Sequence, residues 1–164
     1  MKENLDLGLK DKVAIVAGGG SNGDGIGNGR AASMLLAEAG AKVLVVDINK
    51  KFAQNTVNLI KNNGGNAFAI GADLTSTAEC KKVVKEVINK WNRLDILDNN
   101  IGIASNTSVV NENERYWDKV MNINLKPMFL MSKYSIPAMI NSSNGGVIIN
   151  ISSISATRPK GYTS

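Results

Sequence analysis

A glycine-rich segment, Gly18–Gly29, contains the residues best suited to bind phosphate. It follows the apolar run Val13–Ala17, and the composition of Arg30–Ala39 after it is that of a helix. Glycines let the backbone turn through positive φ and bring its N–H groups close to a pyrophosphate, and a helix N-terminus adds partial positive charge. The next apolar run ends in Asp47, 18 residues after Gly29, where a carboxylate that binds a ribose diol is expected. Glycine clusters also form flexible loops, so the prediction of a dinucleotide site depends on strand, loop, helix and acid together.

Few side chains of this chain could move a proton. It has no histidine and one cysteine, Cys80, which excludes zinc clusters, disulfides within the chain and every histidine-dependent triad. Acid–base chemistry must therefore use Ser, Tyr, Lys, Asp or Glu. No metal site is expected.

Length and composition predict a single α/β domain over residues 1–164, with 43% hydrophobic residues. No apolar run approaches the ~18 residues of a membrane span, and Met1–Asp6 lacks the apolar stretch of a signal peptide. We therefore expect a cytoplasmic protein with no membrane partner. The net charge of +5 is spread along the chain, and its densest cluster is interpreted as a solvated helix face and not a nucleic-acid site: Lys81, Lys82, Lys85 and Lys90.

Strand-like and helix-like segments alternate along the chain. Five short apolar runs predict a parallel sheet covered on both faces: Lys12–Ala17, Lys42–Asp47, Asn66–Ile70, Leu94–Asp98 and Gly146–Ile151. Helices are predicted near Arg30–Ala39, Lys50–Asn62, Thr77–Trp91 and Asn113–Ile140. Ser76 and Glu79 form a capping-box pattern before the third helix. Pro127 cannot donate a hydrogen bond to the carbonyl of Ile123 and should distort the last helix beside Asn124.

The glycine segment resembles the TGxxxGxG motif of the short-chain dehydrogenase/reductase family, with Ala17 in place of the threonine and a longer loop. Counting back from the helix pairs three glycines with the motif: Gly18, Gly27 and Gly29. This pairing holds because Arg30 directly follows the last glycine, as in the family. The alternative pairing starts from Gly25-Ile26-Gly27, which spells the family's GIG two residues earlier. The resemblance implies that the loop binds the cofactor through Gly18, Ser21, Gly25, Gly27, Asn28 and Gly29.

Further motifs of the family follow in order. Gly71–Leu74 resembles the segment whose acid binds the adenine ring, and Asp98–Gly102 resembles the NNAG motif, with Ile101 in place of alanine. Asp47 closes the strand that carries the ribose-binding acid. The resemblance therefore implies these further cofactor ligands: Asp47, Asp73, Leu74, Asn100 and Gly102.

Two segments resemble parts of the family's catalytic set. Asn122–Phe129 is similar to the segment of the active-site asparagine, which places Asn124 at that position. Ile149–Ser153 is similar to the strand-end serine motif, which implies that Ser153 is the catalytic serine, or Ser152 if the register shifts by one.

The family's Tyr-x-x-x-Lys motif, which transfers the proton at the substrate oxygen, follows the serine by about a dozen residues. This chain ends at Ser164, eleven residues after Ser153. Tyr162 comes too early for the motif and is interpreted as a loop aromatic. The resemblance thus covers the N-terminal two-thirds of the family, and we expect this chain alone to be inactive.

The resemblance implies a Rossmann-type α/β fold, a doubly wound parallel sheet in three α/β/α layers that lacks the family's C-terminal strands and helices. It implies an oxidoreductase that transfers a hydride between NAD and a secondary alcohol or ketone, a small-molecule substrate. NADP is disfavoured by Asp47, and a homo-oligomer is expected for a complete chain. The alternative is a dinucleotide-binding module without turnover. A different Rossmann enzyme, such as a methyltransferase, is disfavoured by the ordered motifs.

Overall fold

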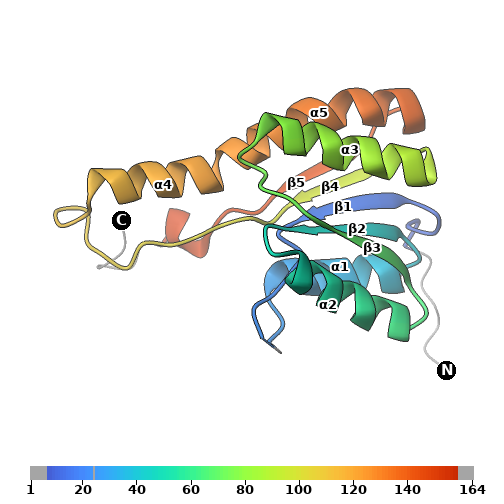
Figure 1. Cartoon of the computed structure of the whole chain (residues 1–164), viewed down its shortest axis with the longest axis horizontal. Coiled ribbons are helices and arrows are strands. Elements are labelled where there is room, and N and C mark those ends of the chain that lie inside the picture. The colour runs from blue at the N-terminus through green and yellow to red at the C-terminus, as the bar shows by residue number, and fades with distance from the viewer. Residues whose placement is uncertain (1–6, 24, 159–164) are drawn as a thin grey trace.

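A parallel β-sheet lies between two layers of helices (Figure 1). The computed structural model describes residues 7–23 and 25–158. Neighbouring strands pair parallel in the order β3-β2-β1-β4-β5. Their bounds are Val13–Ala17 (β1), Lys42–Asp47 (β2), Asn66–Gly71 (β3), Ile96–Asn99 (β4) and Val147–Asn150 (β5). Because the order runs outward from β1 in both directions, the sheet is doubly wound, as predicted.

The helices divide between the two faces of the sheet. One face is covered by α1 (Asn28–Glu38) and α2 (Lys50–Asn62), and the other by α3 (Thr77–Trp91) and α5 (Lys126–Ser143). The remaining helix, α4 (Glu114–Asn124), extends beyond the sheet (Figure 1) and has no buried residue among those that the structure describes. This confirms the three predicted layers. Within residues 7–23 and 25–158, no helix is both long and apolar enough to cross a bilayer.

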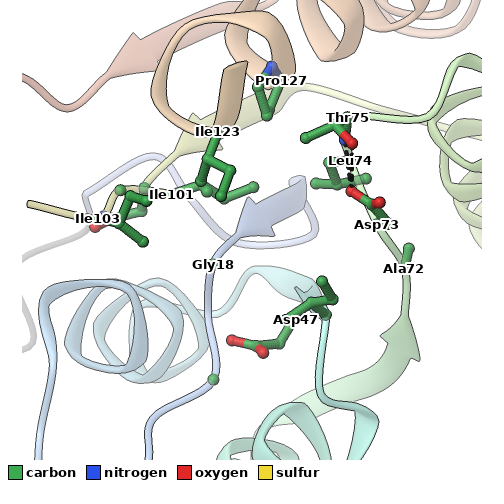
Figure 2. A pocket seen from close by; sticks show the side chains of 14 residues that line it. Gly18, Asp47, Ala72, Asp73, Leu74, Thr75, Ile101, Ile103, Ile123 and Pro127 are labelled. Carbon is green, nitrogen blue, oxygen red and sulfur yellow. Dashed lines mark hydrogen bonds between the residues drawn. The ribbon is translucent and has the colours of Figure 1, made fainter. Parts of the chain in front are cut away.

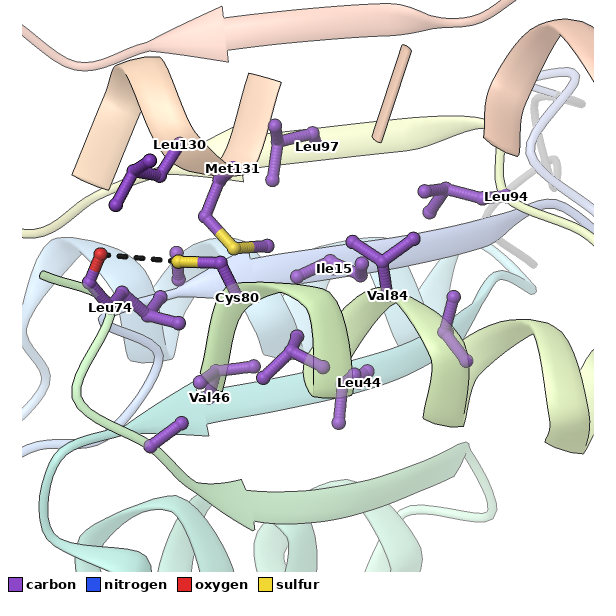
Figure 3. Close-up of a cluster of buried hydrophobic side chains, with 14 of the residues drawn as sticks. Ile15, Leu44, Val46, Leu74, Cys80, Val84, Leu94, Leu97, Leu130 and Met131 are labelled. Atoms are coloured by element: carbon purple, nitrogen blue, oxygen red, sulfur yellow. Dashed lines mark hydrogen bonds between the residues drawn. The ribbon is translucent and has the colours of Figure 1, made fainter. Parts of the chain in front are cut away.

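The larger hydrophobic core lies between the sheet and the layer of α3 and α5 (Figure 3). Alternate residues of β1, β2 and β4 pack against the inner faces of these helices. The strands contribute Ile15, Leu44, Val46 and Leu97, and the helices contribute Val84, Leu130 and Met131. Cys80 belongs to the same core, and its Sγ donates a hydrogen bond to the carbonyl of Leu74 over 3.2 Å. Burial raises the pKa of this thiol to about 11. The cysteine therefore packs as a neutral thiol.

The predicted long helix is in fact two helices, which meet at Leu125. Pro127 lies in the first turn of α5, where its missing N–H removes no hydrogen bond from the helix. The break falls beside Asn124, as predicted, and this asparagine is the last residue of α4. The second helix has Pro137 in its interior and continues to Ser143, three residues beyond the predicted end at Ile140.

The predicted bounds of α2 and α3 are confirmed, and several other ends differ by one to three residues. β4 begins at Ile96, and Leu94 lies outside it: the N–H of Leu94 donates to Ser142 Oγ, 3.0 Å away, and not to a neighbouring strand. α1 begins at Asn28 because Gly27 is its N-cap, whose carbonyl accepts the N–H of Ala31 over 2.9 Å. These ends depend on contacts with distant residues or on backbone geometry, which periodicity does not report.

The register of the sheet brings the carboxyl ends of β1, β2 and β4 together. Ala17 pairs with Val46 on one side and with Asn99 on the other. The residues that follow these strands are therefore neighbours, although they are far apart in the sequence. In doubly wound sheets, ligands bind at this edge, where the strand order reverses.

Candidate functional site

A cavity of about 360 Å³ lies at the carboxyl edge of the sheet, between β1, β2 and β4 (Figure 2). Its walls include six of the residues singled out in the sequence: Gly18, Asp47, Asp73, Leu74, Asn100 and Gly102. They come from loops after four different strands, and the register of the sheet brings them together. The other five candidate cofactor ligands lie in the glycine loop or the first turn of α1, outside these walls: Ser21, Gly25, Gly27, Asn28 and Gly29.

The two ends of the glycine loop are packed backbone against backbone. Gly18 has φ +83°, and a Cβ there would lie 2.8 Å from the carbonyl oxygen of Asn100. A Cβ on Gly29 would collide with the carbonyl oxygen of Gly18. Only glycines permit the first turn of α1 to approach the end of β1 this closely. The N-cap Gly27 has no side chain to bind the first N–H groups of α1, which leaves this helix end open to an anion.

Asp47 is held at the end of β2 by its own backbone neighbourhood. Its Oδ1 accepts the N–H of Asn49 over 2.9 Å. A Cβ on Gly20 would come within 2.5 Å of Oδ2, so the glycine loop passes directly beside the carboxylate. Figure 2 shows this carboxylate turned toward Gly18, and both residues line the cavity. The arrangement suits a carboxylate that accepts two adjacent hydroxyl groups.

Asp73 has its side chain and its backbone fixed separately. Its Oδ1 accepts both the N–H and the Oγ1 hydroxyl of Thr75, over 2.9 Å and 2.8 Å. Its N–H donates to Glu79 Oε2 over 2.6 Å. The predicted capping box is therefore only half formed: Ser76 Oγ accepts the N–H of Glu79, but the Glu79 carboxylate binds Asp73 instead of returning to Ser76. This exchange ties α3 to the wall of the cavity.

Asn124 holds the segment after β4 in place. Its Nδ2 donates to the carbonyl of Ile103 and its Oδ1 accepts the N–H of the same residue, both over 2.9 Å. Its neighbours Ile123 and Pro127 line the cavity, whereas Asn124 does not. At the break between α4 and α5, the side-chain amide of Asn124 therefore binds the backbone of Ile103, in the segment after β4.

Ser153 lies after the end of β5, at the start of the 3₁₀ turn Ile154–Ala156. Its side chain is exposed, and its Oγ accepts the N–H of Ser155 over 3.1 Å. Among the described residues, it neither lines the cavity nor contacts Asn124. Ser152 is exposed as well, and Tyr162 lies outside the described residues.

Six apolar residues form another wall of the cavity: Ile48, Ala72, Ile101, Ile103, Ile123 and Pro127. The alternation of Ile101 and Ile103 beside Gly102 indicates part of this wall, because an extended segment turns every second side chain to the same face. Nothing in the sequence indicated that Ile123 would join them, since it comes from a helix 20 residues further on. A mostly apolar cavity with a few carboxylates and amides suits a planar ring with polar edges.

A buried acid lies one residue before the amides that end β4. Asp98 is 2% exposed, and its Oδ2 accepts a hydrogen bond from Asn100 Nδ2 over 3.2 Å. Its Oδ1 has no partner among the described residues. Burial raises the pKa of this carboxyl, and the hydrogen bond from Asn100 opposes the rise only in part. The charged form of Asp98 is therefore disfavoured in the folded chain.

We expect Asp98→Asn to stabilise the fold by about 1 kcal/mol at pH 7, because the neutral amide has no charge to bury on folding. With its pKa raised by folding, Asp98 contributes fully to wild-type stability below the unfolded pKa, and the contribution is lost as the pH rises through the folded pKa. The gain should thus be absent near pH 3 and develop as the pH rises above about 4. Urea denaturation over this range measures it, with the exposed Asp118→Asn as control. A gain of equal size at low pH would contradict this assignment.

The model of the short chain dehydrogenase family matches residues 12–164. The chain belongs to the short-chain dehydrogenase family. Among curated relatives, an uncharacterized oxidoreductase of Thermotoga maritima is 40% identical over 147 residues, which are 90% of this chain and 55% of the relative. An NAD-dependent glycerol dehydrogenase of Listeria innocua is 34% identical and covers the same shares of the two chains.

The fold also agrees with solved structures of this family of short-chain dehydrogenases. A 7α-hydroxysteroid dehydrogenase in complex with NADH and 7-oxo glycochenodeoxycholic acid superposes with a TM-score of 0.83 and 32% identity. The match covers 94% of this chain and 57% of that structure. The chain thus spans a little over half the length of the relatives and the solved structure that it matches.

Proposed function

We propose that this short-chain dehydrogenase chain binds NAD in preference to NADP and serves hydride transfer between the nicotinamide and a secondary alcohol or ketone. The observation that carries the proposal is the cavity at the carboxyl ends of β1, β2 and β4, which combines Gly18, Asp47, Asp73 and Asn100. Two relatives are consistent with it: one is named as NAD-dependent, and one structure contains NADH.

The residues of the cavity fit the parts of a dinucleotide. Asp47, in the wall of the cavity, would accept the hydroxyls of the adenosine ribose. The apolar wall and Asp73 would hold the adenine ring. The diphosphate would lie against the glycine loop and the open end of α1, whose close packing against the end of β1 requires glycine at positions 18 and 29.

When bound, the nicotinamide ring supplies the acceptor or donor of the hydride. In this proposal, Ser153 would orient the oxygen of the substrate, and Asn124 holds the segment after β4 in place through its two hydrogen bonds to Ile103. Ser153 Oγ only accepts the N–H of Ser155, so its own hydroxyl hydrogen stays available to donate to a substrate. In this proposal the substrate is a small-molecule alcohol or ketone that reaches the end of β5.

A binding module without turnover is the second candidate. Both polar groups of the Asn124 side chain are bonded to Ile103, and Ser153 lies outside the walls of the cavity, within the described part of the chain. Neither observation affects the dinucleotide site itself. The two candidates predict the same binding and differ only in NAD-linked oxidation of alcohols.

We expect Asp47→Ala to lower the preference for NAD over NADP at least about tenfold. The carboxylate accepts ribose hydroxyls but repels a 2′-phosphate, a difference on the order of a few kcal/mol when partly desolvated. Titration calorimetry with both cofactors measures the preference, and Asp118→Ala, an exposed acid on α4, is the charge-matched control. Tighter binding of NADP than of NAD by the wild type would contradict the proposed preference, and failure to bind either would contradict the proposed function.

A further inference from the structure

Arg30 lies beneath the glycine loop and binds it from inside. Its side chain is buried, with the residue 2% exposed, although it is the third residue of a helix at the surface. Its Nη1 donates to the carbonyls of Gly23 and Gly25 over 3.2 Å and 2.6 Å, and its Nη2 to that of Ser21 over 3.1 Å. Its Nε donates to Thr56 Oγ1 over 3.3 Å. The guanidinium of this α1 residue thus connects a side chain of α2 with three backbone carbonyls of the loop.

Thr56 extends this network to the start of the loop. Its hydroxyl donates to the carbonyl of Gly19 over 2.9 Å, and the threonine is fully buried on α2. At the far side, Ser21 Oγ donates to the carbonyl of Gly25 over 2.9 Å, which closes the loop on itself. The carbonyls of the loop therefore turn inward, toward Arg30 and Thr56.

Inward carbonyls orient the N–H groups of the loop outward. The peptide bond is planar and trans in the described residues, so the N–H that follows each carbonyl points the opposite way. The carbonyls of Gly19, Ser21 and Gly25 are each followed by an N–H that faces away from the guanidinium. These N–H groups belong to Gly20, Asn22 and Ile26, and none of them donates to another described residue.

The charge beneath the loop has the sign that suits an anion above it. Among residues 7–23 and 25–158, the side-chain partners of Arg30 are neutral carbonyl and hydroxyl oxygens. Such a set fixes the guanidinium plane but leaves its positive charge in place. Outward N–H groups, a buried cation and the open end of α1 together form a concave site for phosphate oxygens.

We propose that Arg30 is the positioning residue of this loop and holds its N–H groups toward the diphosphate of the bound dinucleotide. The inference rests on the proposed function, and it assigns a specific role to the long form of the loop. A longer glycine loop has more freedom to lose on binding, and a guanidinium anchored to three of its carbonyls removes that freedom before the ligand arrives.

The test compares two probes, ADP and adenosine, by titration calorimetry. Arg30→Lys keeps the charge, but one ammonium cannot bind four oxygens in a plane. We expect affinity for ADP to fall about tenfold and affinity for adenosine to change less than about twofold. The reason is that the cavity for adenosine is lined by none of the three loop residues whose carbonyls Arg30 binds, Ser21, Gly23 and Gly25. Arg115→Lys, the same exchange on the exposed face of α4, should change neither.

Ser21→Ala is the second variant, and it removes the Ser21–Gly25 bond at the surface without altering the core. It should weaken ADP by a smaller factor, again with adenosine unchanged. A merely structural role for Arg30 would weaken both probes by the same factor, and that result, or no loss at all, overturns the inference. If the wild type binds NAD, but Arg30→Lys leaves the ratio of ADP affinity to adenosine affinity unchanged, only this inference is overturned. A wild type that binds neither NAD nor ADP overturns the proposed function as well.

Discussion

Gly29→Ala should reduce dinucleotide affinity by at least about 100-fold, about 2.7 kcal/mol, although it adds only one methyl group. The new Cβ would collide with the carbonyl oxygen of Gly18 and lie 2.9 Å from its carbon. Gly18 cannot withdraw easily, because its N–H donates to the carbonyl of Val46 over 2.8 Å. The first turn of α1 must then move away from the loop, and the phosphate site opens. Titration calorimetry with NAD measures the loss.

Gly64→Ala is the matched control for this change. A Cβ on Gly64 would meet no described atom within 4 Å, and the residue follows α2, outside the glycine loop. Its φ of +81° strains alanine by about 1 kcal/mol, which lowers stability without changing the phosphate site. Equal losses of affinity for Gly29→Ala and Gly64→Ala would show that close packing at Gly29 is not what shapes the site.

Leu97→Ala should destabilise the fold by about 3 kcal/mol, which corresponds to a fall of roughly 6–12 °C in melting temperature. Leu97 is fully buried in β4, in the core between the sheet and the layer of α3 and α5 (Figure 3). Parallel strands on both sides hold β4 in register, so the sheet cannot collapse into the space that the side chain leaves. Thermal and urea denaturation measure the loss.

Leu35→Ala makes the same exchange on α1, where the side chain is 63% exposed. It should change stability by less than about 0.5 kcal/mol, since little apolar surface leaves the core and alanine favours the helix. Similar losses in the two variants would indicate that the core between the sheet and α3 is not the main source of stability.

The sequence predicted the order of elements because local patterns specify them. The apolar spacing along Thr77–Trp91 gave the bounds of α3, and Pro127 located the break beside Asn124. Short apolar runs gave the strands of a parallel sheet. The spacing after the glycine segment indicated Asp47, and the family resemblance implied Asp73 and Asn100. The structure brings all three to one cavity, because strand ends of a parallel sheet share an edge.

The tertiary structure decided the partners of the polar side chains. A charged residue in the first turn of a surface helix is expected to be exposed, yet Arg30 is buried beneath carbonyls of a loop that precedes it. Glu79 binds the N–H of Asp73 instead of completing its capping box, and Asn124 binds Ile103. Periodicity and propensity report only on neighbours along the chain, whereas each of these bonds depends on where a separate segment passes in space. The sequence alone therefore determined the sheet and the residues at its edge, and the packing of loop against helix determined which atoms face a ligand.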